Sequence, residues 1–381
     1  MTPDRISRLQ SQFPHFLGPL SKAYARLMRL RARLFASGKR ASWRPPAPCI
    51  SVGNISWGGT GKTPVVSWLL DWARDEGLRP TVLTRGYGGK PPHRPYAVQL
   101  LSPPHEAGDE PLLLKRTHPQ AQILVDPNRV RAGKIAARKM ADLFVLDDGY
   151  QHLRVQRDLN LCLLSPRDLD EEWNRVIPAG SWREDVSALS RADAFLINTM
   201  FDNDDGCLET VAHIKLAILG KPIFFFRVTA RGVANALTGE TLDTLGDRRF
   251  LLVTAIANPD KVCQTCKTDL GEKPVRHLIY PDHHPFGLSD WQAIVAAAER
   301  NDCAHIVCTP KDAVKLAPFA DERLWTPADD ILFNRRPPFV SRLARRSFSQ
   351  PTMDFTCPRK NKLNHSNFPR KIGRASCRER V

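Results

Sequence analysis

The stretch SWGGTGKTP, residues 56–64, decides the fold. It follows the apolar run CISV (49–52) and precedes a helix-length segment, residues 63–76. A glycine-rich turn that joins a strand to a helix is the setting that a phosphate-binding loop requires. The stretch departs from the usual pattern at Ser56, where such a loop normally begins with glycine.

The residue types in this loop suit a nucleotide phosphate. Backbone amides of residues 58–61 can converge on phosphate oxygens, because glycine allows a close approach and the next helix directs its positive end at the anion. We expect Lys62 to reach the β- and γ-phosphates and the Thr63 hydroxyl to bind Mg²⁺. The alternative is a glycine-rich turn that only starts a helix. The residues predicted to surround the nucleotide are Ser56, Trp57, Gly58, Gly59, Thr60, Gly61, Lys62 and Thr63.

Short apolar runs alternate with helix-length segments through most of the chain. The expected strands are 49–52, 81–84, 123–125, 143–146, 159–164 and 194–197, followed by a second series at 222–228, 250–255, 305–308 and 330–333. Strands alternating with helices predict a mostly parallel sheet covered on both faces. We therefore predict an α/β, P-loop NTPase-like fold with an N-terminal amphipathic helix. The expected units are a basic segment (1–46), a kinase domain (47–215), a smaller α/β domain (216–341) and a tail (342–381).

The basic residues are concentrated at the two ends of the chain. The formal net charge is +16, but residues 1–46 hold ten Lys and Arg against one acid, and residues 342–381 hold eleven against two. The stretch between them carries a net charge of −2. This distribution argues against a nucleic-acid groove across the folded domains and favours termini that contact an anionic surface. No nucleic-acid partner and no obligatory protein partner is expected.

The segment 19–35 has the periodicity of an amphipathic helix. Its apolar stripe consists of Leu20, Tyr24, Leu27, Leu30 and Leu34, with arginines off the stripe. Two interpretations stay open from the residues alone: a helix packed on its own domain, or a helix lying in a membrane interface. The tail 342–381 is basic and irregular, and we expect it to be disordered or non-native.

Two acidic motifs are candidates for chemistry. In ADLFVLDDGYQH (141–152) an apolar strand ends at Asp147 and Asp148, which can hold Mg²⁺ beside the phosphate loop unless they only open the turn at Gly149. In AGDEP (107–111), Asp109 could simply cap the following helix, which is the commoner role of such a residue. A further motif, YPDHHPF (280–286), holds two histidines in a proline-flanked loop.

These motifs together resemble one family. The blocks VGNISWGGTGKTP, TRGYGG, GDEP, DDGYQH, PAGSWRE, IANP, PDHH and KDAVKL follow one another in the order found in tetraacyldisaccharide 4′-kinases, the lipid A kinases of Gram-negative bacteria. The resemblance runs from about residue 19 to residue 316. The loop of this family also lacks the first glycine, so Ser56 fits it.

The resemblance implies a phosphoryl transfer from ATP to the 4′-hydroxyl of a tetraacylated glucosamine disaccharide 1-phosphate, which yields the lipid IVA precursor. It implies a monotopic enzyme on the cytoplasmic face of the bacterial inner membrane, with the sugar in a cleft between two domains. The lipid disaccharide and the anionic membrane surface are then the partners, and the interfacial interpretation of helix 19–35 is favoured.

Site residues follow from the same resemblance. Asp109 is the expected base and His283 the residue that pairs with it and tunes it. Glu110 and Asp148, with Thr63, are the expected Mg²⁺ ligands. The residues expected at the substrate and its phosphates are Arg85, Asp147, Gln151, His152 and Arg183.

Two departures from the family pattern lie near these residues: Trp182 stands where leucine is usual, and Pro310 stands where glutamate is usual. The alternative function is a membrane-recruited P-loop ATPase that acts as a positioning switch. It is disfavoured because Trp57 stands where such ATPases carry lysine.

Overall fold

The computed structural model describes Gln10 and residues 14–199, 205–246, 248–271, 273–334 and 337. The predicted tail, 342–381, and most of the first 13 residues lie outside this range. Within it, no helix is both long and apolar enough to span a membrane.

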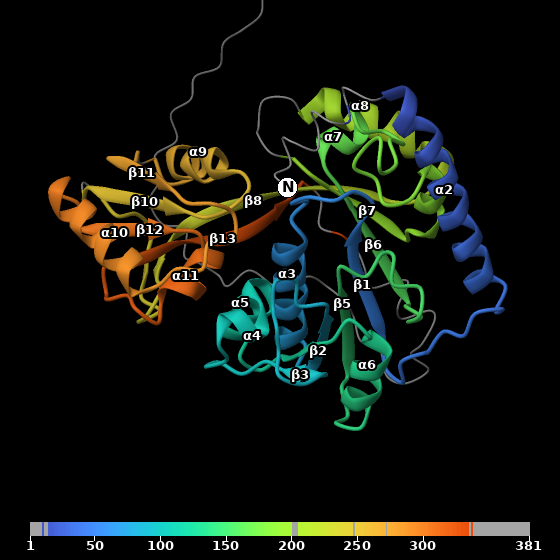
Figure 1. The fold of residues 1–381 in the computed structure, drawn as a ribbon, viewed down its shortest axis with the longest axis horizontal. Coiled ribbons are helices and arrows are strands. Elements are labelled where there is room, and N and C mark those ends of the chain that lie inside the picture. Colours follow the sequence, from blue (N-terminus) through green and yellow to red (C-terminus); the bar gives the residue numbers. More distant parts are fainter. Residues whose placement is uncertain are drawn as a thin grey trace, which may run out of the picture.

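One sheet runs through the whole molecule (Figure 1). In spatial order its strands are β11 (Arg276–Ile279), β10 (Phe250–Thr254), β12 (His305–Cys308), β13 (Leu324–Phe333), β8 (Ile223–Asn235), β7 (Ala194–Asn198), β6 (Leu159–Leu164), β1 (Cys49–Asn54), β5 (Leu143–Asp147), β2 (Pro80–Thr84), β4 (Gln122–Val125) and β3 (Tyr96–Ala97), with β9 (Thr241–Leu242) paired to β8. Neighbours pair in parallel except β13–β8, β8–β9 and β3–β4. The predicted α/β class is therefore confirmed.

Helices cover both faces of the sheet. They are α2 (Pro14–Ala36), α3 (Lys62–Asp75), α4 (Pro104–Ala107), α5 (Asp109–Thr117), α6 (Arg129–Ala137), α7 (Pro166–Leu169), α8 (Asp205–Leu216), α9 (Pro259–Asp269), α10 (Leu288–Arg300) and α11 (Pro310–Leu316), with short 3₁₀ turns at Val186–Arg191 and Ala217–Leu219. Successive side chains of a strand point to opposite faces of the sheet, so each strand contributes to the hydrophobic cores on both faces. Ile50 of β1 packs in the core with α3 and α5, whereas Cys49 packs with α6.

The second series of strands is covered in the same way. Leu251 and Val253 face α10 and α11, whereas Phe250 and Leu252 face α9. The long antiparallel pair of β8 and β13 joins the two series, and β8 also pairs in parallel with β7. The sheet is thus continuous across the predicted boundary at residue 216. The division into two domains stays a prediction.

The expected strands all form, but β8 continues seven residues beyond its predicted end at 228, to Asn235. The prediction missed β3, β9, β11 and the first half of β13. The first two are only two residues long, and β11 (RHLI) is rich in polar residues, so none has an apolar run to reveal it. The fold places the ends of β1 and β5 side by side, because Val52 is in register with Asp147.

Candidate active site

The phosphate loop connects β1 to α3, as predicted. Gly61 stands just before the helix with φ of 90°, a conformation that favours glycine. A Cβ atom at this position would lie 2.9 Å from Asn198 Nδ2, so the fold also leaves no room for a side chain. Lys62 opens α3, and its Nζ donates to Asn54 Oδ1 at 3.2 Å. The lysine is therefore held over the end of β1.

Three more predicted residues meet at this lysine. Asp148 lies 3.5 Å from Lys62 Nζ, and both of its carboxylate oxygens accept from Arg183 Nη1 at 3.0 Å. Gln151 accepts from the same Arg183 nitrogen at 3.4 Å and donates to the Asn54 carbonyl at 2.9 Å. The structure thus brings Lys62, Asp148, Gln151 and Arg183 together at the carboxyl ends of β1 and β5.

The two neighbouring aspartates have different electrostatic surroundings. Burial raises the pKa of Asp147, and the charges of Asp148 and Glu110 add to this, although Thr84 Oγ1 donates to it at 2.8 Å. Burial also acts to raise the pKa of Asp148, but Lys62 and Arg183 outweigh it and the net pKa is lowered. Asp148 is therefore the more firmly ionised of the pair.

Asp109 and His283 form a direct pair. His283 Nδ1 lies 3.1 Å from Asp109 Oδ2, although the two residues are 174 positions apart. Asp109 is the first residue of α5, and the residue before it is Gly108, with φ of 86°. The N-cap position of this helix is Gly108, and the Asp109 side chain pairs with His283. The Asp109 carboxylate is thus turned toward the loop that carries His283.

Helix α11 lies beside α5 (Figure 1). It places two lysines next to the Asp109–His283 pair. Lys311 forms an ion pair with Glu110, and Lys315 Nζ lies 3.7 Å from Asp109 Oδ2. Burial acts to raise the pKa of Asp109, but the hydrogen bond with His283 and the charges of Lys315 and Lys311 lower it overall. In return, the hydrogen bond to Asp109 raises the pKa of His283. The pair is thus charged, with the carboxylate ionised and the imidazole protonated more readily than usual.

The two clusters lie within electrostatic reach of each other. Glu110 belongs to the Asp109 group, yet its charge contributes to the raised pKa of Asp147, after burial and the charge of Asp148. Glu110 therefore links the Asp109–His283 pair electrostatically to the phosphate-loop cluster.

Two predicted residues stand outside these contacts. Arg85 follows β2 and is exposed, and among the described residues no ion pair of Arg85 is found. Burial and nearby arginines lower the pKa of His152 to about 4, so its imidazole is neutral near pH 7. His152 Nε2 is buried without a hydrogen-bond partner in the described part of the chain.

Comparison with known proteins bears on this arrangement. The family model described as tetraacyldisaccharide-1-P 4′-kinase (LpxK) matches residues 13–347. The tetraacyldisaccharide 4′-kinase of Nitratidesulfovibrio vulgaris is 44% identical over 322 residues, which cover 84% of this chain and 89% of that protein. The enzyme of Pseudomonas entomophila is 38% identical, with 83% of this chain and 87% of that protein covered.

This chain belongs to the tetraacyldisaccharide 4′-kinase family. A crystal structure of LpxK from Aquifex aeolicus, described as in complex with ATP, superposes with a TM-score of 0.67 at 27% identity. The match covers 86% of this chain and 96% of that one. The family resemblance predicted from the motifs is confirmed.

Both departures from the family pattern have a structural account. Trp182 is fully buried, its Nε1 donates to Asp168 at 3.1 Å, and its backbone bridges to Ser56. The next residue, Arg183, is anchored by its backbone N–H to the Ile55 carbonyl at 2.7 Å, which aims its side chain at Asp148. Pro310 takes the first turn of α11, where a missing N–H costs no helical hydrogen bond.

Several residues of this kinase site were missed from the sequence. Asn54 holds Lys62, and Asn198 at the end of β7 donates to the Thr60 carbonyl at 3.3 Å. Lys311 and Lys315 contact the Asp109 group. Asn54 and both lysines lie in blocks that carry the family resemblance, so the signal was present without a role attached. Asn198 lies in no such block.

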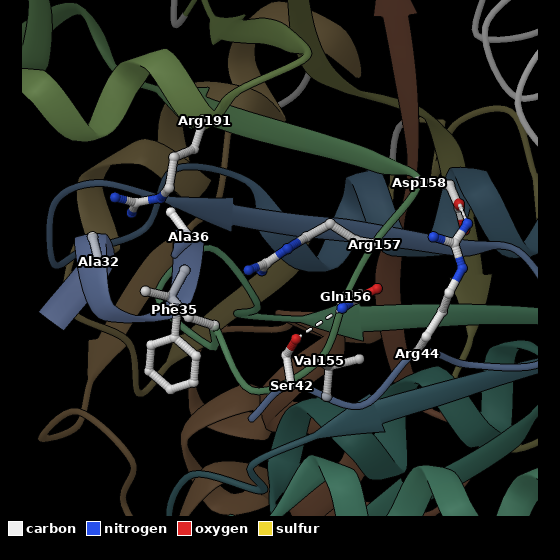
Figure 2. Close-up of a pocket in the computed structure, with 11 residues that line it drawn as sticks. Ala32, Phe35, Ala36, Ser42, Arg44, Val155, Gln156, Arg157, Asp158 and Arg191 are labelled. Atoms are coloured by element: carbon white, nitrogen blue, oxygen red, sulfur yellow. Dashed lines mark hydrogen bonds and ion pairs between the residues drawn. The ribbon is translucent and has the colours of Figure 1, made fainter. Parts of the chain in front are cut away.

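A separate cavity of about 370 Å³ lies near the amino ends of β1 and β6, away from the phosphate loop (Figure 2). It is bounded by the last turn of α2, the segment before β1 and the segment before β6, and its polar lining includes Arg44, Arg157 and Arg191. Asp158 in this cavity accepts from the backbone N–H of Cys49, the first residue of β1. None of the predicted kinase residues lines the cavity, so it is distinct from the candidate active site.

Proposed function

We propose that this chain transfers the γ-phosphate of ATP to the 4′-hydroxyl of a tetraacyldisaccharide 1-phosphate. The single observation that carries this assignment is the Asp109–His283 pair beside the Lys62 loop, in a chain of this family. A positioning ATPase needs the loop but has no use for a base paired across 174 residues. A kinase needs both.

ATP is proposed to bind at the loop between β1 and α3. Backbone amides of residues 58–61, the N-terminal end of α3 and Lys62 supply the positive charge for its phosphates. Thr60 Oγ1 and Asn198 Oδ1 are buried beside the loop and have no hydrogen-bond partner among the described residues. These unsatisfied atoms support a ligand that completes their hydrogen bonds.

Mg²⁺ fits the side chains proposed to hold it. Mg²⁺ in phosphoryl-transfer sites is bound through one or two carboxylates, waters and substrate phosphates, rather than by an all-protein cage. Thr63, Asp148 and Glu110 are the proposed protein donors, and the lowered pKa of Asp148, where Lys62 and Arg183 outweigh burial, keeps that donor ionised. When bound, the ion neutralises charge on the transferring phosphoryl group.

Asp109 is the proposed general base. Its carboxylate accepts the proton of the 4′-hydroxyl as the new O–P bond forms, and the bond from the γ-phosphorus to the bridging oxygen breaks to release ADP. The lowered pKa of Asp109 makes it a weak base, so positioning of the hydroxyl must supply much of the rate gain. His283 holds the carboxylate in place and stabilises its charge.

The remaining predicted residues are proposed to contact the substrate. Arg183 and Gln151 already form one group with Asp148, which supports a role near the transferred phosphate. Arg85 is exposed at the end of β2 and is free to reach a phosphate from solvent. Asp147 and His152 follow from the family resemblance, and both lie in the same segment as Gln151.

Helix α2 is proposed to rest in the membrane interface. Its inner side packs on the protein, where Ser21 donates to the Val176 carbonyl at 2.8 Å and Arg31 to the Gln151 carbonyl at 3.0 Å. Its outer side carries Leu27 and Leu30, which are 57% and 53% exposed. Exposed leucines flanked by arginines suit an anionic lipid surface.

This arrangement supports a monotopic enzyme on the cytoplasmic face of the bacterial inner membrane, with residues 47–215 and 216–341 as the two domains around the sugar. We propose the double substitution of Leu27 and Leu30 by glutamate as its test. Binding to vesicles of phosphatidylglycerol and phosphatidylcholine should fall strongly, while Leu101→Glu, at an exposed position outside α2, should bind as the wild type does. Equal binding by all three proteins would refute the interfacial role of α2.

The activity is tested by transfer of labelled γ-phosphate from ATP to tetraacyldisaccharide 1-phosphate in detergent micelles. The wild type should form the 4′-phosphorylated product and Asp109→Ala should not. ATP hydrolysis stimulated by lipid, without product, would favour the positioning ATPase.

A further inference from the structure

A buried lysine stands behind the proposed base. Lys315 is only 7% exposed, and its Nζ lies 3.0 Å from Asp312 Oδ1 and 3.7 Å from Asp109 Oδ2. The ring of Phe286 covers the ammonium group at 5.4 Å. A buried ammonium needs compensating charge, and here two carboxylates share it. One belongs to α11 itself, whereas the other is the proposed base on α5.

Asp312 ties this lysine to the second member of the pair. Its side chain is completely buried, and its Oδ2 accepts from Thr309 Oγ1 at 2.8 Å and from the Ala255 N–H at 2.9 Å. The Ala255 carbonyl in turn accepts from the backbone N–H of His283 at 3.1 Å. From Asp312, ion pairs therefore lead through Lys315 to Asp109, and hydrogen bonds lead through Ala255 to His283.

The backbone of His283 needs such support. Its φ is 59°, in the left-handed region that costs energy for a residue with a side chain. The hydrogen bond to Ala255 fixes this conformation and so fixes the direction in which the imidazole leaves the loop. Asp312 and Lys315 on the inner face of α11 therefore influence both the position of the His283 imidazole and the charge around the Asp109 carboxylate.

We propose that Lys315, supported by Asp312 and Thr309, is a positioning residue that holds the Asp109 carboxylate in place beside His283. This inference rests on the proposed role of Asp109 as the base. It gives the TPKDAVK segment (309–315) a purpose beyond starting a helix. The charged groups that act on Asp109 are then His283 from its loop and Lys315 and Lys311 from α11, with Glu110 next to it on α5.

Substitution of Lys315 tests the proposal by separating kcat from the KM for ATP. Lys315→Met removes the charge, and Lys315→Gln removes it while keeping a hydrogen-bond donor in the same space. In both, the Asp109 carboxylate loses the ammonium group that lies 3.7 Å from it. The kcat should fall about tenfold, because the carboxylate loses its support.

Two controls separate positioning from a general structural effect. Lys315→Arg, which restores the charge, should return kcat toward that of the wild type. Lys267→Met, at an exposed position on α9, should leave kcat unchanged. The KM for ATP should stay within about twofold in all variants, since Lys315 does not contact the phosphate loop.

A second readout does not depend on turnover. The titration of His283, followed by nuclear magnetic resonance of ring-labelled histidine, should shift to a lower pKa in Lys315→Gln, because the Asp109 carboxylate that raises the pKa of His283 is no longer held beside it. An unchanged His283 titration and an unchanged kcat would overturn the proposal. If the wild type gave no phosphoryl transfer, the proposed function would fail, but the His283 titration would still test the contact itself.

Discussion

The phosphate loop takes its residues from one short stretch, whereas the Asp109–His283 pair joins residues 174 positions apart. The first part is a strand, a turn and a helix in direct succession, and Lys62 donates to Asn54 of the preceding strand, although Asp148 also lies 3.5 Å from it. The second part exists only when α5, the loop of His283 and α11 come together. The phosphate loop therefore depends on one local stretch of sequence, whereas the Asp109–His283 pair forms only in the folded protein.

This difference has consequences for how each part fails. Substitutions in the phosphate loop are expected to remove contacts with the nucleotide directly. The Asp109–His283 pair can also be disrupted by substitutions in any element that supports it, including residues that contact neither substrate. The four predictions that follow test the two parts in order of expected effect.

Lys62→Ala should have the largest effect, with turnover reduced by at least about 100-fold. The substitution removes the cation placed for the β- and γ-phosphates and leaves Asp148 with Arg183 as its direct partner. Steady-state phosphoryl transfer measures the loss. The matched control is Lys134→Ala, on the exposed side of α6, which should retain wild-type turnover. Near-normal turnover in Lys62→Ala would show that this loop does not bind the reacting phosphates.

Asp109→Asn should also reduce turnover by about 100-fold or more, while ATP still binds. The amide keeps the shape of the carboxylate but cannot accept the hydroxyl proton. Equilibrium binding of a fluorescent ATP analogue should match that of the wild type, since Asp109 lies outside the phosphate loop. Asp75→Asn, an exposed acid at the end of α3, serves as the control. Normal turnover in Asp109→Asn would show that Asp109 only begins helix α5 and does not act as the base.

Gly108→Ala should give a smaller loss through position alone. With φ of 86°, a side chain is strained there, and a Cβ atom would lie 2.9 Å from the Tyr87 carbonyl oxygen. We expect destabilisation of about 1–3 kcal/mol and a fall in turnover of about tenfold as Asp109 shifts. Gly77→Ala is the control, because Gly77 also has positive φ but faces open space. Equal turnover in both variants would show that Asp109 tolerates displacement.

The pH dependence of stability should reveal the charged pair. The pKa of Asp109 is lowered below its ordinary 3.8, with burial outweighed by His283 and the lysines, so its stabilising contribution is present above that pH and is lost as pH falls through the lowered pKa. The hydrogen bond to Asp109 raises the pKa of His283, so its contribution is present below 6.5 and is lost as pH rises through the raised pKa. The wild type should therefore exceed His283→Ala in thermal stability most clearly between about pH 4 and 6.5. A constant difference from pH 4 to 9 would contradict the pairing.

The sequence alone predicted best those parts of the site whose residues are close together in the chain. The phosphate loop, the strand that ends at Asp147 and the carboxylate at Asp148 follow from apolar runs and adjacent polar residues. The Asp109–His283 pair did not follow from the residues, since Asp109 looked more like a helix cap; only the family resemblance joined the two. The motifs carry no distance between them, and that distance is set by the packing of α11 against α5.

The elements and residues that sequence missed have the same cause. Strand β11 pairs with β10 through its backbone, and its polar side chains hide it. Lys315 appears in the sequence as one more basic residue of a short helix, and its burial between two carboxylates depends on tertiary contacts. Trp182 stands where leucine is usual in the family, and its buried ring packs against that of Trp173.

A kinetic double-mutant cycle on Asp109 and His283 tests the central claim most directly. Turnover is measured for the wild type, Asp109→Asn, His283→Ala and the double variant under one set of conditions. If the two residues act as a unit, the double variant should be about as slow as Asp109→Asn alone, because the imidazole has no role once the base is gone. Losses that multiply in the double variant would show that His283 acts independently, and the account of a base assembled across the fold would be wrong.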